Sequence, residues 1–266
     1  MIKEIKELSA EDVAGICDHT FLDRVESYRT TVKPGESPVI EWGKSFRGFI
    51  EDSAHLKYPP YAVCIRPENV WHAKSILKEK ELRKSNIKIA SVVGFPNILY
   101  YTPEWQLNEA RLAIEDGANE IDFVFNYGPL YLGGIWSAID EIKQISDITK
   151  KSGVLSKMIL ETSELDNERI IQACKLADKY GLDFVKTSTG FSSAGAKPEH
   201  LKIMRENFPR GVKMSGGVNP GNLNELLYAV SGRTDGKIDL DPLKVRIGES
   251  SLLNKLIDAA AGSSTY

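Results

Sequence analysis

The 266-residue chain has few cysteines, few histidines and no long apolar run. Its three cysteines, Cys17, Cys64 and Cys174, are odd in number and widely spaced. That pattern argues against a disulfide framework or a zinc site, and it predicts reduced thiols in a cytoplasmic protein. The four histidines are scattered, with no His-Glu-x-x-His, so we expect no metal. No segment approaches transmembrane length and the N-terminus lacks a signal-peptide core, so we expect no membrane association.

Charge of one sign is also lacking. The net charge of −3 gives no electrostatic case for nucleic acid or an anionic membrane as a partner. There is no Walker A sequence, no Gly-x-Ser-x-Gly elbow and no paired-cysteine zinc pattern. The 42% hydrophobic and 27% charged residues are ordinary for a globular protein, so the chain can bury a large core.

Strand-like and helix-like segments alternate along the chain. Ser9 and Asp12 indicate a short first helix, and a helix-like segment follows each strand. The alternation predicts parallel strands, and eight of them close into a single (β/α)8 TIM barrel, one α/β domain over residues 1–266. A doubly wound open sheet is the alternative, but its Gly-rich fingerprint after the first strand is absent. The expected strands are 16–20, 62–65, 87–95, 120–126, 157–161, 183–191, 211–218 and 244–248.

Two expected strands each carry a lysine within an apolar run, Lys186 and Lys213. A lysine in a strand either reaches water at the strand end or is desolvated, and desolvation lowers its pKa. For an isolated strand lysine we favour the first reading, but a second lysine reverses this, since a like charge also lowers an amine's pKa. We therefore expect both amines to resist protonation, and a neutral amine attacks carbonyl groups. Alternation in 120–126 places Glu120, Asp122, Val124 and Asn126 on one face and Ile121, Phe123 and Phe125 on the other, so the Asp122 carboxylate can move protons beside the amines.

Other strand ends supply further polar side chains, because chemistry in a barrel lies where the strands end. Asp18 could orient a substrate hydroxyl or cap a loop. Cys64 is read as a small buried side chain that can form a pocket wall. Lys157 and Glu161 share a strand face, and either pair inside the barrel or take part in catalysis.

Two glycine-containing turns suit a phosphate group. Residues 215–218 follow the seventh strand and residues 248–251 follow the eighth, where barrels frequently bind phosphate through backbone amides. Ser250 and Ser251 add hydroxyl donors. The Glu249 carboxylate should point away from such an anion. Together these features favour amine chemistry on a phosphorylated carbonyl compound.

Seven short motifs together resemble the deoxyribose-phosphate aldolase family, class I aldolases of deoxynucleoside breakdown. The resemblance spans nearly the whole chain in the right order, and Lys-Thr-Ser-Thr-Gly-Phe at 186–191 and Lys-x-Ser-Gly-Gly at 213–217 are its specific elements. The others are Asp-His-Thr at 18–20, Ala-Val-Cys-Ile at 62–65, Val-Val-Gly-Phe-Pro at 92–96, Glu-Ile-Asp at 120–122 and Arg-Ile-Gly-Glu-Ser-Ser at 246–251.

The resemblance implies a reaction and a set of roles. Lys186 forms the Schiff base, Lys213 is the second lysine that perturbs Lys186, and Asp122 takes part in proton transfer. The reaction is the reversible cleavage of 2-deoxy-D-ribose 5-phosphate to acetaldehyde and D-glyceraldehyde 3-phosphate, with the iminium as electron sink and therefore no metal or other cofactor. The expected partners are the phosphosugar and aldehyde substrates and further copies of the chain, in a dimer or tetramer. The implied substrate-binding residues are Asp18, Thr20, Cys64, Thr189, Gly190, Gly216, Gly217, Gly248, Ser250 and Ser251.

Several features stand apart from the family pattern. The polar segment 23–36, which we predict to be a loop, makes the first connection longer than is common, and Asn219 stands where many members have arginine. The resemblance itself makes Tyr266 a candidate proton carrier, because some relatives end in a mobile tail with a terminal tyrosine; a frayed terminus is the equal alternative. A sister class I aldolase acting on a different aldehyde also fits. A non-catalytic binding protein on this fold would be expected to have lost Lys186 or Asp122.

Overall fold

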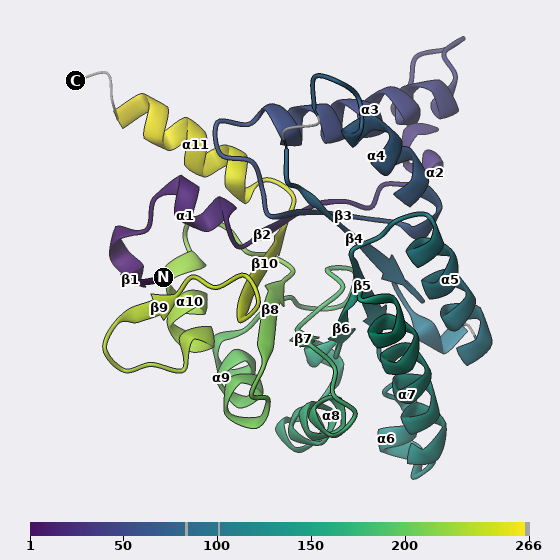
Figure 1. Cartoon of the computed structure of the whole chain (residues 1–266), viewed down its shortest axis with the longest axis vertical. Coiled ribbons are helices and arrows are strands. Elements are labelled where there is room, and N and C mark those ends of the chain that lie inside the picture. The colour runs from purple at the N-terminus through teal and green to yellow at the C-terminus, as the bar shows by residue number, and fades with distance from the viewer. Residues whose placement is uncertain (83–84, 101, 264–266) are drawn as a thin grey trace.

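The fold is a closed barrel of eight parallel strands, as predicted, in a computed structural model that describes residues 1–82, 85–100 and 102–263 (Figure 1). Around the ring the order is β10-β2-β3-β4-β5-β6-β7-β8, so the first and last strands of the barrel are hydrogen-bonded neighbours. The strands are β2 Cys17–Phe21, β3 Ala62–Ile65, β4 Lys88–Val93, β5 Glu120–Val124, β6 Leu155–Ile159, β7 Phe184–Lys186, β8 Gly211–Ser215 and β10 Val245–Glu249.

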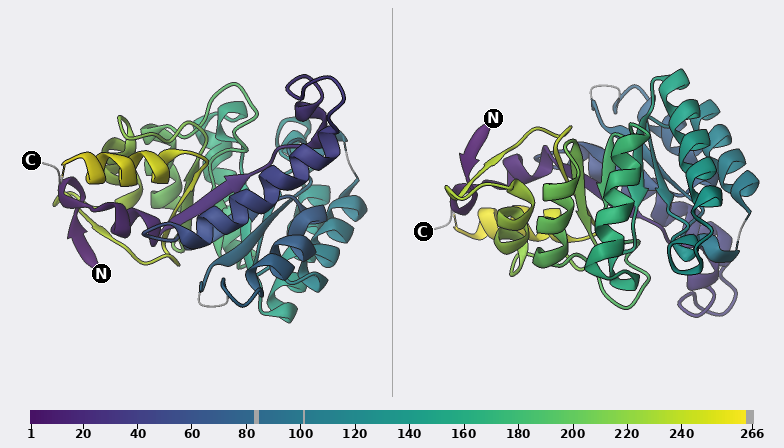
Figure 2. Two further views of the ribbon diagram at one scale, coloured as in Figure 1. Left: turned by 90° about the horizontal axis from the view of Figure 1, so that it is seen from above. Right: turned by 90° about the horizontal axis from the view of Figure 1, so that it is seen from below.

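Helices form the outer layer and follow the strands in turn (Figures 1 and 2). Their starts obey local signals: Thr102 caps α5 by accepting from the Trp105 amide, and Pro103 occupies the first turn. The predicted capping box of Ser9 and Asp12 opens α1 Ala10–Ala14. The principal helices are α3 Pro38–His55, α4 Val70–Leu77, α5 Pro103–Glu115, α7 Ile135–Ser152, α8 Asn167–Lys179, α9 Pro198–Asn207, α10 Leu223–Ser231 and α11 Leu252–Ser263.

Some short elements differ from the prediction. The segment 23–36 holds a one-turn helix, α2 Val25–Tyr28, and is otherwise irregular. Outside the barrel, β1 Ile2–Glu4 pairs antiparallel with β9 Lys237–Asp239, which three-residue stretches without alternation could not reveal. β7 ends at Lys186, five residues before the predicted end, because the chain turns off into a loop where Gly190 has a φ of +87°. The remaining short elements are η1 Ile5–Glu7, η2 Pro67–Asn69, η3 Ile98–Tyr100, α6 Gly128–Leu132 and η4 Thr162–Glu164.

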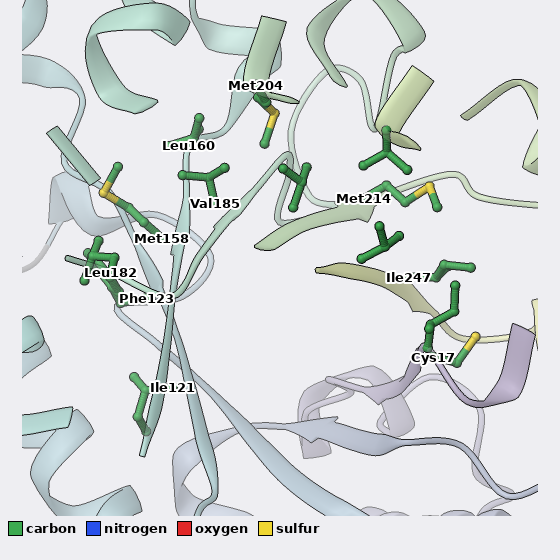
Figure 3. Close-up of a cluster of buried hydrophobic side chains, with 14 of the residues drawn as sticks. Cys17, Ile121, Phe123, Met158, Leu160, Leu182, Val185, Met204, Met214 and Ile247 are labelled. Atoms are coloured by element: carbon green, nitrogen blue, oxygen red, sulfur yellow. The ribbon is translucent and has the colours of Figure 1, made fainter. Parts of the chain in front are cut away.

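The strands separate an apolar outer core from a mixed interior, because successive side chains point to opposite faces. On the outer side Ile121 and Phe123 pack among residues such as Val185 and Met214 (Figure 3). On the inner side the predicted face of β5 is confirmed: Glu120 and Asp122 join a buried cluster of charges, and Val124 joins a small apolar cluster. No helix within the described ranges combines the length and apolar character needed to cross a bilayer. Burying charges is costly unless they are paired, so the interior cluster indicates where the chemistry lies.

Candidate active site

A cavity of about 730 Å³ opens at the ends of the barrel strands and holds most of the residues predicted from the sequence. Its wall is built from the loops after β2, β7, β8 and β10, with Lys186 as the inner amine. The predicted residues that line it are Thr20, Lys186, Thr189, Gly190, Gly216, Gly217, Gly248, Ser250 and Ser251. Asp18, Cys64, Asp122 and Lys213 are not in its wall; they are buried inside the barrel.

Asp122 lies at the centre of the reactive group. Its Oδ2 atom accepts from Lys186 Nζ at 3.0 Å and from Lys213 Nζ at 2.7 Å, and its Oδ1 atom lies 2.5 Å from Lys157 Nζ. Strand register produces this arrangement: Lys186 on β7 is directly opposite Lys213 on β8, and Asp122 on β5 is opposite Lys157 on β6. All four side chains therefore point into the barrel at neighbouring levels.

The two predicted lysines differ in protonation. Burial lowers the pKa of Lys186, and the adjacent positive charge of Lys213 lowers it further. Burial also opposes the charge on Lys213, but the carboxylates of Asp122 and Asp18 prevail and raise the pKa of Lys213 above its usual value. The expectation that both amines resist protonation is therefore wrong for Lys213. Its Nζ atom lies 2.6 Å from Asp18 and 2.7 Å from Asp122, whereas Lys186 contacts one carboxylate.

Beneath these residues the charges are balanced. Burial alone would raise the pKa of Asp122, but the three lysines hold it well below its usual value, so this carboxylate is ionised. Asp18 behaves in the same way: against burial, Arg246 and Lys213 lower its pKa to about 2. Arg246 bonds to both Asp18 and Glu120, and Glu120 also contacts Lys157 at 2.5 Å. Apart from Lys186, the cluster thus holds three cations and three carboxylates, and protonation of Lys186 would unbalance it.

Three members of this cluster, Lys157, Glu120 and Arg246, were not predicted as site residues. Lys157 was expected either to pair with Glu161 or to act in catalysis; it pairs instead with Asp122 and Glu120. The signal was present in the sequence, as charged residues at inward positions of strands. What could not be read was their pairing, which depends on how the barrel closes.

Glu161 is a further residue with unusual geometry. It follows β6 with a φ of +54°, the left-handed conformation, which no other described non-glycine residue adopts. Its carboxylate accepts from Thr189 Oγ1, and burial raises the pKa of Glu161. Glu161, Thr189 and Phe191 help to line a second cavity of about 270 Å³, which shares Thr189 and Phe191 with the first. Strain of this kind clusters at functional sites, and the sequence carried no signal for it.

The glycine turns allow close approach of two loops. Gly216 and Gly217 have φ angles of +83° and +73°, and a Cβ on Gly195 would lie 2.0 Å from the Gly216 carbonyl oxygen. The Gly217 carbonyl accepts from the side-chain amides of Asn219 at 2.9 Å and Asn222 at 3.0 Å, which fixes the turn. Successive amides in such a turn suit an anion.

Glu249 lies beside the second turn with its carboxylate hidden. The carboxylate bonds to His19 Nδ1 at 2.7 Å and accepts from the Leu252 amide at 2.6 Å, at the start of α11. It is 1% exposed, so it is turned away as the sequence led us to expect. His19 stacks on Phe49, which lines the cavity.

Two other predicted residues have different surroundings. Cys64 lies in the small apolar cluster inside the barrel, and burial raises the pKa of its thiol, so it does not present a thiolate. Tyr266 lies outside the described residues. Among the described side chains, no group of three or more His, Cys, Asp or Glu residues is arranged to hold a metal ion.

The sequence and the structure are both similar to those of known aldolases. Residues 53–254 match the family described as DeoC/LacD family aldolase. A deoxyribose-phosphate aldolase of Thermococcus gammatolerans is 43% identical over 166 residues, which are 61% of this chain and 72% of that protein. One of Caldicellulosiruptor saccharolyticus is 37% identical over 214 residues, 79% of this chain and 87% of that protein. The solved structure of QR15, an aldolase, superposes with a TM-score of 0.73 at 27% identity, covering 95% of this chain and 98% of that one.

Proposed function

Because the chain belongs to the DeoC/LacD family of aldolases, we propose that it catalyses the reaction of its deoxyribose-phosphate aldolase relatives. That reaction is the reversible cleavage of 2-deoxy-D-ribose 5-phosphate to acetaldehyde and D-glyceraldehyde 3-phosphate. The enzyme is a carbon–carbon lyase. The observation that carries the assignment is the contact of one Asp122 oxygen with two lysines, of which Lys186 lines the cavity and has the lowered pKa.

In the proposed mechanism the neutral Lys186 amine attacks the aldehyde carbon of the open-chain sugar, and loss of water gives an iminium. A base removes the proton of the C3 hydroxyl, and the C2–C3 bond breaks with its electrons moving into the iminium. Glyceraldehyde 3-phosphate leaves and an enamine remains. Protonation of the enamine at C2 and hydrolysis of the resulting iminium release acetaldehyde and restore Lys186.

Asp122 and Lys213 serve these proton transfers in complementary ways. Asp122 is an ionised acceptor in contact with Lys186, and Lys213 is a protonated donor on the same oxygen. A proton can therefore pass between the two amines through one carboxylate, which leaves the net charge of these buried groups unchanged. Lys213 also keeps Lys186 neutral between turnovers.

The substrate contacts form part of the same proposal. In this proposal Thr20 and Thr189 contact the sugar, and the phosphate is surrounded by Gly190, Gly216, Gly217, Gly248, Ser250 and Ser251. Asp18 and Cys64 act from behind the wall: Asp18 holds Lys213, and Cys64 belongs to the apolar packing. Tyr266 remains a proposed proton carrier.

Reduction with borohydride in the presence of 2-deoxyribose 5-phosphate tests the mechanism, followed by peptide mass mapping. We expect a covalent adduct on Lys186, and we expect Lys186→Met to lose both the adduct and turnover while remaining folded. Its matched control is Lys157→Met, which removes a buried lysine that does not line the cavity. Substantial cleavage by folded Lys186→Met would refute the assignment. An adduct with other aldehydes only would favour a sister class I aldolase.

We further propose that the chain forms one domain and assembles as a homo-oligomer, a dimer or tetramer. The outer surface of α5, α6 and α7 supports assembly, because its large apolar side chains include Leu132 and Trp136, 87% and 75% exposed, together with Trp105 and Leu112. These helices pack side by side (Figure 1). Light scattering that gives the mass of one chain would refute assembly. Three unbridged cysteines support a reducing, cytoplasmic setting.

A further inference from the structure

The cavity has very little positive charge for a site that takes a phosphate ester. Among the described residues that line it, the ionisable side chains are Asp23, Lys186, Glu249 and Lys255. Two of these are carboxylates, of which Glu249 is hidden by its contacts with His19 and the Leu252 amide. The Lys186 amine donates a hydrogen bond to Asp122 and forms the Schiff base in the proposed reaction, so it is not available to bind the phosphate. A dianionic group in this cavity would therefore meet one available cation, Lys255.

Polar groups near the turns are partly committed to the protein itself. Asn219 donates to the Gly217 carbonyl through its Nδ2 atom and accepts from the Gly221 amide through its Oδ1 atom, so both ends of its amide are occupied. At the start of α11 the Glu249 carboxylate accepts hydrogen bonds from the backbone amides of Leu252 and Leu253. The positive end of this helix is thus neutralised by the protein and contributes little to binding an anion.

Lys255 is well placed to supply the missing charge. It lies on α11 one turn after Ser251, and its amide donates to the Ser251 carbonyl at 3.2 Å. Side chains of a helix lean toward its N-terminus, which directs Lys255 back over the turn at 248–251. Lys255 is exposed, and it forms no ion pair with any described residue, so binding an anion does not require breaking an existing pair.

We propose that Lys255 is the cation that binds the phosphate group of the substrate and sets the preference for a phosphorylated over an unphosphorylated sugar. The assignment rests on the proposed aldolase function and adds a specificity-determining residue to it. An ammonium group on a phosphate oxygen forms a charge-assisted hydrogen bond, stronger than the neutral bonds from amides and hydroxyls nearby. It also offsets the repulsion of the substrate by the Asp23 carboxylate.

Kinetics with a pair of substrates tests this proposal. The rates of cleavage of 2-deoxyribose 5-phosphate and of 2-deoxyribose are measured for the wild type, Lys255→Met and Lys255→Arg. For Lys255→Met we expect kcat/KM for the phosphorylated sugar to fall by about tenfold or more, through KM, the range of one charge-assisted bond. For 2-deoxyribose, kcat/KM stays within experimental error. Lys255→Arg keeps the charge and most of the preference. Lys202→Met on α9, at an exposed lysine outside the cavity wall, is the matched control.

The outcomes separate this inference from the function on which it rests. A wild type that cleaves neither sugar refutes the aldolase proposal. A wild type that cleaves 2-deoxyribose 5-phosphate, with Lys255→Met keeping the same preference, refutes the role of Lys255. Equal loss on both sugars also refutes it, because that pattern indicates a structural part for Lys255 in α11; thermal unfolding of the variant checks this.

Discussion

Replacing Lys213 by methionine tests how the barrel keeps Lys186 neutral. The substitution removes a cation but preserves much of the side-chain volume, and it leaves Asp122 paired with Lys186 and Lys157. Both amines donate to Asp122 Oδ2, from 3.0 and 2.7 Å, so the two nitrogen atoms are no more than about 6 Å apart. If both were protonated, they would repel each other by about 3 kcal/mol at a dielectric constant of about 20. That repulsion disfavours the protonated form of Lys186 by a factor on the order of a hundred.

The expected result is a shift of the pH profile. Lys186 has a pKa below its ordinary value and reacts as the neutral amine, so without Lys213 its pKa rises and less of it is neutral at pH 7. The rate of Schiff-base formation with acetaldehyde, trapped by cyanoborohydride, isolates this step from later proton transfers. At neutral pH we expect that rate to fall by a factor on the order of a hundred and to recover as the pH is raised.

The matched control is Lys157→Met, which also removes a lysine from Asp122 but from its other oxygen. We expect a smaller shift, since Lys157 does not share an oxygen atom with Lys186. If the acid limb of the Lys213→Met profile stays in place, or if the trapping rate falls equally at every pH, then Lys213 does not act by keeping Lys186 neutral. Both variants unbalance buried charges, so trapping is measured below their unfolding temperatures.

Three further predictions concern stability and the phosphate loops. Arg246→Met leaves Asp18 and Glu120 without one buried cation and should lower the free energy of unfolding in urea by about 3–5 kcal/mol. The control Arg233→Met, at an exposed pair with Asp235, should change it little, and equal effects of the two variants would contradict the role of the cluster. Since the pKa of Asp18 is about 2 when folded and about 4 when unfolded, its contribution to stability is present above pH 4 and is lost as pH falls toward 2. Melting temperatures over that range should therefore drop less for Asp18→Asn than for the wild type. If the two proteins lose melting temperature equally as pH falls, Asp18 does not contribute to the pH dependence of stability. Gly195→Ala places a methyl group 2.0 Å from the Gly216 carbonyl oxygen and should raise KM for the phosphorylated sugar, while Gly48→Ala, whose added Cβ meets nothing within 4 Å, should not.

The residues that strand alternation places on one face were predictable. Once alternating strands and helices predict a barrel, three apolar runs suffice to predict three inward side chains. These runs carry Lys186, Lys213 and Asp122. The two-residue period fixes the face, and strand order brings the faces together. The same reasoning separated Ile121 and Phe123, which pack outside, from Glu120 and Asp122, which lie inside.

Pairing and charge state could not be predicted in this way. Arg246 is near the end of the chain and Asp18 is near its start, and only closure of β10 on β2 makes them partners. The protonation of Lys213 depends on two carboxylates within 2.7 Å, a distance that no spacing in the sequence specifies. The left-handed conformation of Glu161 arises from tertiary packing and contradicts the local preference of glutamate.

The contacts of Arg246 have a consequence for how the protein matures. Arg246 belongs to β10, which is synthesised after the other seven strands of the barrel, whereas its partners Asp18 and Glu120 lie on β2 and β5. Until residue 246 arrives, a nascent chain that collapsed around Asp18, Glu120 and Asp122 would bury three carboxylates with only two of their three cations, Lys157 and Lys213, which is unfavourable. The interior charges thus oppose premature closure of the incomplete ring. The buried charges that surround Lys186 are therefore balanced only once β10 has closed the barrel.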